Sequence, residues 1–317
     1  MKRFLCLLLF SVSAAIARGQ VVRQPDFTIS GVGAKPVAAI ACSPDARFLA
    51  VGGSDYAILL YDVRADGELR DLLSRKLRGH EAPIVAFSFE NAKTLVSVSL
   101  DQTAKIWNVA SGKLVHSEEL NLGKQFVAAL APGNQPLLAG ASGNRVRLWN
   151  YESGALLKSF EANDSAISTL AFTPDGKLLV IGTTKGVIRV MDVAAWKVAR
   201  IIDMDSPVHS LAASSERIVV GYADGTLNLL SLGEPTSIPE IKGHRGAVSA
   251  LVFSPKGEYF ASGSTDGAVK VWDSDSLKSL YTLAGPTAQV VSIVFSADGK
   301  HVAVVDANGA VDCWHIR

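Results

Sequence analysis

The residues best suited to metal binding and acid–base chemistry in this chain of 317 residues are its six histidines. Their spacings match no metal-ligand motif. The histidines are His80, His116, His209, His244, His301 and His315. The sequence also contains no Gly-x-Ser-x-Gly nucleophile elbow, no phosphate-binding glycine loop and no Cys-x-x-Cys pair. We therefore predict no catalytic residue, no metal site and no cofactor.

Five Asp-Gly pairs offer carboxylates that calcium could use. Each pair falls between two β-rich runs, where a tight turn favours Asp and Gly for backbone reasons. The sequence therefore predicts turns rather than calcium sites at these positions. The pairs begin at Asp66, Asp175, Asp224, Asp266 and Asp298.

The three cysteines are the remaining reactive side chains. Cys6 lies in an apolar N-terminal segment. Cys42 and Cys313 occupy positions where equivalent segments of the chain carry Phe or Val, so we expect them to act as small buried hydrophobic residues. A disulfide between them stays open as an alternative if the protein is exported.

The N-terminal segment has the three parts of a signal peptide. Lys2 and Arg3 give a positive start, Phe4 to Ala17 is an uncharged stretch of 14 residues, and Ala15-Ile16-Ala17 suits a signal peptidase. The apolar stretch is shorter than the roughly 20 residues that cross a bilayer. We expect residues 1–17 to be removed and residues 18–317 to form the mature protein in a secreted or periplasmic location. A retained N-terminal segment in a cytoplasmic protein is the alternative.

Charge argues against a nucleic-acid partner. The formal net charge is +1, and it becomes −1 once Lys2 and Arg3 are removed. Proteins that bind nucleic acid usually carry a basic surplus, because they replace the counterions of the phosphates. The balanced charge therefore predicts that nucleic acid is not the partner. No later segment is long and apolar enough to span a membrane.

The strongest pattern in the sequence is an internal repeat of about 42 residues. Each unit closes on an aromatic or bulky residue, with successive spacings of 46, 42, 42, 39, 42 and 42. These seven residues are Tyr61, Trp107, Trp149, Met191, Leu230, Trp272 and Trp314. Within a unit, four short β-rich runs alternate with turn clusters, as Ala247–Phe253, Tyr259–Ser264, Ala268–Trp272 and Leu277–Leu283 show. Four antiparallel strands per unit predict an all-β, seven-bladed propeller in one domain.

Two units carry a further signature, in which Leu77-Arg78-Gly79-His80 leads to Ile106-Trp107 and Ile241-Lys242-Gly243-His244 leads to Val271-Trp272. With these motifs the chain resembles the WD-repeat family. The resemblance implies a hydrogen-bond network of four side chains in each of these units. Its members would be His80, Ser97, Asp101 and Trp107 in the second unit, and His244, Ser262, Asp266 and Trp272 in the sixth.

The other units depart from this pattern, with Gly143 or Asn308 in place of the Asp and Met191 or Leu230 in place of the Trp. We expect apolar packing to hold those units. The last unit also ends after its third strand. In the other units a fourth strand comes directly before the next Gly-His corner, and Asp26–Ser30 has this position ahead of the first unit. We therefore predict that Asp26–Ser30 completes the last blade.

The resemblance implies a monomeric ring that binds a protein or peptide partner through the face carrying the Gly-His corners. On that face four apolar residues of the second and third units are expected to cluster: Pro83, Val85, Leu100 and Phe126. Such patches often mark partner sites, although Val85 and Phe126 could instead turn inward and pack. The competing hypotheses are a propeller enzyme, similar to lactonases or dehydrogenases, and a propeller that binds carbohydrate or another small ligand.

Overall fold

The computed structural model describes residues 21–29, 37–53, 55–63, 69–121, 123, 126–133, 135–162, 165–233 and 240–316. The predicted signal peptide, residues 1–17, lies outside this part of the chain, as does Ser30 at the end of the predicted closing segment.

The described residues form 29 strands and no helix. In chain order the strands of the N-terminal half are β1 (Val21–Arg23), β2 (Phe27–Ile29), β3 (Val37–Cys42), β4 (Phe48–Gly53), β5 (Ile58–Val63), β6 (Leu69–Leu77), β7 (Ile84–Asn91), β8 (Thr94–Ser99), β9 (Thr103–Asn108), β10 (Leu114–Glu119), β11 (Val127–Leu130), β12 (Leu137–Ser142), β13 (Arg145–Asn150) and β14 (Leu156–Glu161). The remaining strands are β15 (Ile167–Phe172), β16 (Leu178–Thr183), β17 (Val187–Asp192), β18 (Lys197–Asp203), β19 (Ser210–Ala213), β20 (Arg217–Gly221), β21 (Thr226–Ser231), β22 (Ile241–Lys242), β23 (Val248–Phe253), β24 (Tyr259–Ser264), β25 (Val269–Asp273), β26 (Ser279–Leu283), β27 (Val290–Phe295), β28 (His301–Asp306) and β29 (Val311–His315).

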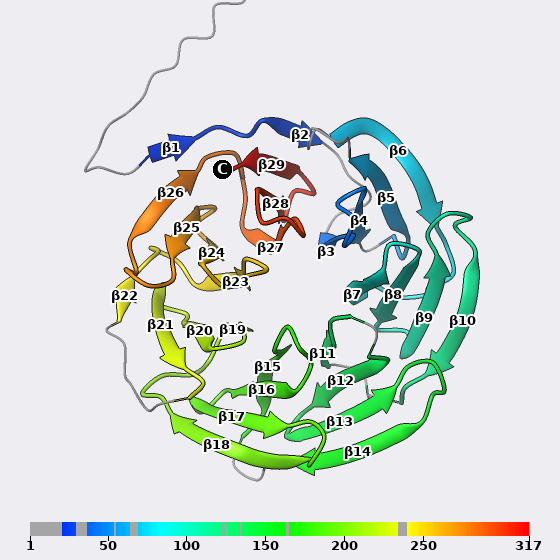
Figure 1. The fold of residues 1–317 in the computed structure, drawn as a ribbon, viewed down its shortest axis with the longest axis horizontal. Helices are drawn as coiled ribbons and strands as arrows, with labels where there is room; N and C mark the ends of the chain where they lie inside the picture. Colours follow the sequence, from blue (N-terminus) through cyan, green and yellow to red (C-terminus); the bar gives the residue numbers. More distant parts are fainter. Residues whose placement is uncertain are drawn as a thin grey trace, which may run out of the picture.

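These strands build seven sheets arranged around a ring (Figure 1). Blades 1 to 6 each contain four consecutive antiparallel strands, beginning with β3, β7, β11, β15, β19 and β23. Blade 7 takes β27, β28 and β29 from the C-terminus and β2 from the N-terminus. The predicted seven-bladed propeller is therefore confirmed, including closure of the last blade by an N-terminal strand.

The closing strand is well tied to its neighbour. Phe27, Thr28 and Ile29 pair antiparallel with Cys313, Asp312 and Val311. The Ile29 side chain is only 4% exposed, because it enters the apolar layer between blades 7 and 1. This placement joins an N-terminal strand to the C-terminal strand and covers the outer edge of β29.

Strand β1 is an addition that the repeat does not predict. It pairs in parallel with β26 and gives blade 6 a fifth strand at its outer edge (Figure 1). The guanidinium of Arg23 lies 4.1 Å from the centre of the Tyr281 ring, and its Nη1 atom donates to the His315 carbonyl at 2.7 Å. These contacts fix the segment that leads into the closing strand.

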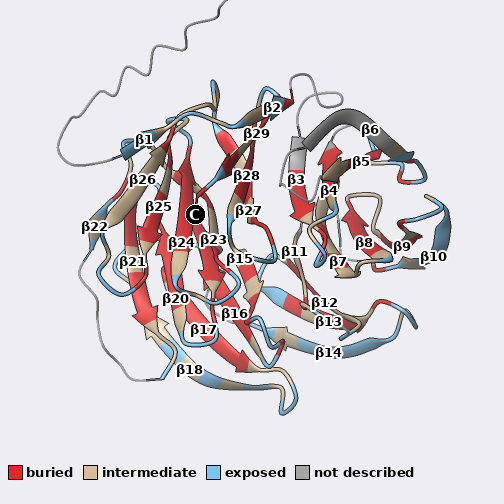
Figure 2. Ribbon diagram, turned by 45° about the horizontal axis from the view of Figure 1, so that its top comes forward, coloured by how far each residue is buried: buried red, intermediate tan, exposed pale blue. Residues whose placement is uncertain are grey.

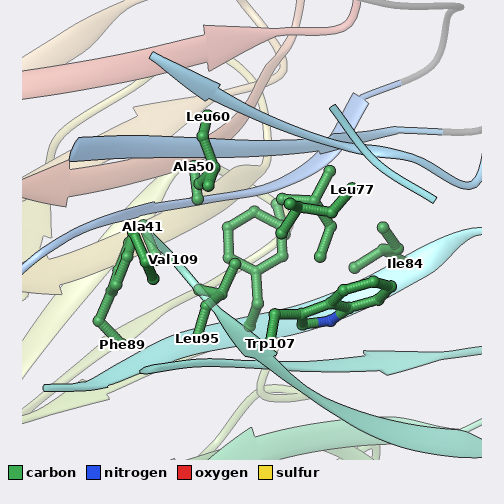
Figure 3. Close-up of a cluster of buried hydrophobic side chains, with 12 residues drawn as sticks. Ala41, Ala50, Leu60, Leu77, Ile84, Phe89, Leu95, Trp107 and Val109 are labelled. Carbon is green, nitrogen blue, oxygen red and sulfur yellow. The ribbon is translucent and has the colours of Figure 1, made fainter. Parts of the chain in front are cut away.

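The core consists of seven apolar clusters, one between each pair of neighbouring blades. Buried residues concentrate on the inner and middle strands, and exposed residues on the outer strands (Figure 2). The layer between blades 1 and 2 is an example, where Leu60 and Leu77 of blade 1 pack with Ile84, Leu95 and Trp107 of blade 2 (Figure 3). Because every blade is sealed on both faces, blades without the polar network keep their place by apolar packing.

Among the described residues, none forms a helix with the length and apolar character needed to cross a membrane.

Candidate functional site

Four side chains of blade 2 join in one chain of hydrogen bonds. The His80 ring lies with Nε2 2.7 Å from the Ser97 hydroxyl and Nδ1 2.8 Å from an Asp101 carboxylate oxygen. The Ser97 hydroxyl also accepts the indole N–H of Trp107 at 2.8 Å. Because a carboxylate only accepts, Nδ1 of His80 carries the proton and its Nε2 accepts from the Ser97 hydroxyl. Polar atoms that would be costly to bury alone are thus paired.

This chain of hydrogen bonds fixes the corner before β7 to the turn after β8. The Asp101 carboxylate accepts the backbone N–H of Glu81 at 3.0 Å. The Ser99 hydroxyl donates to the Ala82 carbonyl at 2.8 Å. The Leu100 N–H donates to the Pro83 carbonyl at 2.9 Å. The corner and the turn of blade 2 are therefore held together as one rigid unit.

Blade 6 repeats the network with one link missing. His244 Nε2 lies 2.7 Å from the Ser262 hydroxyl, which accepts the Trp272 indole N–H at 2.8 Å. His244 Nδ1 is 3.8 Å from Asp266 and has no hydrogen-bond partner among the described residues. The Asp266 carboxylate instead accepts the backbone N–H groups of Arg245 at 2.8 Å and Ala268 at 2.9 Å.

Burial keeps both histidines neutral at neutral pH. Desolvation lowers the pKa of His244 to about 4, against a weaker opposing effect of the Asp266 charge. Desolvation also lowers the pKa of His80, although the hydrogen bond that His80 donates to Asp101 acts in the opposite direction. Both side chains are 0% exposed. Rings that are sealed in this way hold the corners in place and are not available to a substrate.

The predicted apolar patch divides into two parts. Val85 and Phe126 are half-buried and pack against the apolar cluster between blades 2 and 3. Pro83 and Leu100 are also half-buried, but they lie on the two loops that the His80 network connects. For Val85 and Phe126, inward packing therefore fits the structure better than membership of an exposed patch. Pro83 and Leu100 are left as the apolar pair presented at this corner.

Equivalent corners in other blades have the same backbone link but smaller or polar side chains. Thr265 N–H donates to the Ala247 carbonyl in blade 6, and Thr184 N–H donates to the Ala166 carbonyl in blade 4, both at 2.9 Å. Among these matched corners, blade 2 alone carries Pro and Leu. This difference in side chains marks the corner of blade 2 as the candidate binding surface.

Comparison with known families matches these blades directly. The model described as "WD domain, G-beta repeat" matches residues 24–62, 72–108, 235–273 and 277–315. The chain belongs to the WD-repeat propeller family. The model described as "Anaphase-promoting complex subunit 4 WD40 domain" matches residues 144–216, which lie in blades 3 to 5 of this WD-repeat propeller.

Curated relatives share only part of their length with this WD-repeat propeller. A protein named "Poly(A)+ RNA export protein" from Schizosaccharomyces pombe is 27% identical over 128 residues, which cover 39% of this chain and 32% of the relative. "Pre-mRNA-processing factor 17" from Saccharomyces cerevisiae is 31% identical over 97 residues, covering 30% of this chain and 20% of the relative. The matched segments thus span about a third or less of these relatives.

The two cysteines of the WD-repeat propeller meet at the seam between blades 7 and 1. Cys42 and Cys313 are not joined by a disulfide, and both pack against the apolar cluster of that seam. Desolvation by burial raises the pKa of Cys42 to about 11 and also raises the pKa of Cys313. Both cysteines line a cavity of about 620 Å³. Cys42 stands at a repeat position where blades 2, 4, 6 and 7 have the larger Phe.

Sequence reasoning missed a second cavity of about 350 Å³ between blades 4 and 5. It is lined by Tyr222, which stands at a repeat position that most other blades fill with Ser, Thr or Asp. This substitution is the signal in the sequence that could have identified the cavity.

Proposed function

We propose that this WD-repeat propeller is a protein-interaction scaffold that acts as a monomeric ring in an exported compartment. The observation that carries the proposal is the apolar pair Pro83 and Leu100, displayed on two loops that the His80 network holds rigid. A surface that is ordered before binding loses less conformational entropy when a partner docks. A partner with a small apolar side chain at its contact point fits this corner.

The export part of the proposal is supported by the order of charged, apolar and small residues at the N-terminus. The names of the two curated relatives refer to RNA export and pre-mRNA processing, which makes an RNA-associated role the competing possibility. The near-neutral net charge of the chain supports a protein partner over RNA.

The proposal is tested by comparing Leu100→Asp with Thr265→Asp, which makes the same change at the equivalent corner of blade 6. Each tagged variant is purified from the native host, and the co-purifying proteins are quantified by mass spectrometry. We expect Leu100→Asp to lose a specific partner at least about tenfold, since a carboxylate would be desolvated at the contact. The Thr265→Asp variant should retain that partner.

Equal retention of all partners by both variants would contradict the role of this corner. Loss of the association after ribonuclease treatment would contradict a protein partner and support the RNA-associated role.

A further inference from the structure

The cavity between blades 4 and 5 occupies the place where blades 2 and 6 keep their polar network. In blade 5, Met204 stands at the position of the His, Val220 at that of the Ser and Leu230 at that of the Trp. Leu is much smaller than Trp, and neither Met nor Val can continue a hydrogen-bond chain. Two of these residues, Met204 and Leu230, line the cavity of about 350 Å³.

Tyr222 adds a phenol hydroxyl to the lining of this cavity. In blades 2 and 6 the equivalent residues, Ser99 and Ser264, accept the backbone N–H of the following turn at 3.1 Å. Tyr222 is too long to do the same and extends into the seam. Its side chain lines the cavity, the residue is only 4% exposed, and its hydroxyl has no hydrogen-bond partner among the described residues. A hydroxyl that lines a cavity and has no protein partner can pair with a polar ligand.

The charges around Tyr222 indicate that such a ligand would be positively charged. Four carboxylates line the same cavity: Asp203, Asp205, Asp224 and Glu240. The side chain and backbone N–H of Thr226 donate to Asp224 at 2.6 and 3.0 Å, which lowers the pKa of that carboxyl and keeps it ionised. Desolvation and the charges of Asp205, Glu240 and Asp224 raise the pKa of Tyr222, so its hydroxyl stays protonated.

Basic groups offset only part of this negative charge. Arg200 lines the cavity, and its Nη1 atom donates to the carbonyl of Ser231 at 2.7 Å. The charge of Lys242 contributes to the lowered pKa of Asp224. The four carboxylates therefore outnumber the nearby cations.

The shape of the site favours an organic cation over a metal ion. Within the described residues, no three His, Cys, Asp or Glu side chains converge closely enough to share a metal ion. Ile202, Met204 and Leu230 supply an apolar wall beside the carboxylates. An alkyl stem would pack on this wall while its charged end faces the acidic side.

We propose that the seam between blades 4 and 5 is a binding site for an aliphatic amine, whose ammonium group lies among the carboxylates and donates to the Tyr222 hydroxyl. The methylene stem contacts Met204 and Leu230. A free small-molecule amine and a lysine side chain of a protein share this chemistry. The site is separate from the corner of blade 2 and does not depend on the proposed scaffold role.

The test is calorimetric titration of the purified full chain with spermidine and with N-acetyl-lysine amide. N-acetyl-norleucine amide, which lacks the amine, serves as the neutral control. We expect one or both amines to bind with a stoichiometry of one and the neutral analogue not to bind. Binding of spermidine alone assigns a free amine as the ligand, and binding of the lysine derivative assigns a protein side chain.

Two variants test whether the amine binds at this seam. The exposed pair Asp205→Asn with Glu240→Gln should raise the Kd at least about tenfold, since charge-assisted hydrogen bonds are lost. Tyr222→Phe should raise it by about threefold to tenfold through loss of a single hydroxyl. Glu119→Gln, an exposed carboxylate on the outer strand of blade 2, is the matched control and should leave the Kd unchanged.

A thermal melt of each variant checks that the propeller is folded, and the exposed carboxylate pair keeps the test decisive if Tyr222→Phe is unstable. The proposal is overturned by the absence of amine binding. It is equally overturned if the neutral analogue binds as tightly, or if the carboxylate pair variant binds like the Glu119 control.

Discussion

Thr28 in strand β2 donates a hydrogen bond of 2.5 Å to the carboxylate of Asp312 in strand β29, although the two residues are 284 positions apart. This contact lies in the middle of the closing pair of strands, next to the buried side chain of Ile29. Burial raises the pKa of Asp312, and the hydroxyl of Thr28 opposes that effect. The two ends of the chain are thus joined by both an apolar and a polar contact.

Removal of residues 24–30 should therefore destabilise the whole ring. The deletion exposes the edge of β29, loses the burial of Ile29 and leaves Asp312 without its donor. We expect a loss of about 3–5 kcal/mol and a fall in Tm of roughly 10 °C, measured by differential scanning calorimetry. The milder variant Thr28→Val should cost about 1–3 kcal/mol. A melting temperature that does not change on deletion would contradict the assignment of β2 as the closing strand.

The Ser97 hydroxyl, which His80 and Trp107 share, should stabilise the fold more than an ordinary surface hydroxyl does. In the Ser97→Ala variant, His80 Nε2 and Trp107 Nε1 both lose a buried partner. We expect the free energy of unfolding to fall by about 2–4 kcal/mol in guanidinium chloride titrations. Ser215→Ala changes an exposed serine and should alter stability by less than about 0.5 kcal/mol. Equal effects of the two variants would count against the network as a stabilising element.

Stability should fall between pH 6.5 and pH 4 because of His244. Its pKa is about 4 in the folded protein and 6.5 in the unfolded chain, so the unfolded chain binds more protons in this range. The free energy of unfolding therefore falls as the pH falls, and the loss due to this residue reaches about 3 kcal/mol near pH 4.

The pH effect is measured by urea unfolding at pH 7, 5.5 and 4.5 in the wild-type chain and in His244→Gln. The variant should show a shallower pH dependence than the wild type. His209→Gln, which alters an exposed histidine, should keep the wild-type slope. If His244→Gln also keeps that slope, the ring is protonated without cost and its burial does not control the pKa.

Export should leave a defined N-terminus. N-terminal sequencing of the protein recovered from the periplasm or the medium should give Arg18 as the first residue, since Ala15-Ile16-Ala17 precedes it. An Ala17→Asp variant, which puts a charge at the expected cleavage site, should accumulate as the longer precursor. Recovery of the protein only from the cytoplasm, with residues 1–17 retained, is the opposing result.

The fold could be read from the sequence because the repeat specifies it redundantly. The 42-residue period, the Asp-Gly turns and the missing fourth strand of the last unit all indicate the same closed ring. Strand β1 was not predictable in this way. Val21–Arg23 belongs to no repeat position, and its parallel pairing with β26 depends on where the closing strand carries the chain.

The candidate site was only partly predictable. The family motif places the two histidines beside their serines, but it does not predict that His244 stops 3.8 Å from Asp266. The inward packing of Val85 and Phe126 depends on how far blades 2 and 3 approach each other. The Tyr222 cavity follows from three separate losses of bulk or polarity in blade 5, which combine only when that blade packs against blade 4.

The most direct test of the account is photocrosslinking at the corner of blade 2 in living cells. A photoreactive phenylalanine analogue at Leu100 should give one discrete adduct with a protein, identified by mass spectrometry and resistant to ribonuclease. The same analogue at Thr265, on the equivalent corner of blade 6, should not give that adduct. The absence of any adduct at Leu100, or the same adduct at both positions, would contradict the assignment of this corner as the surface that binds the partner.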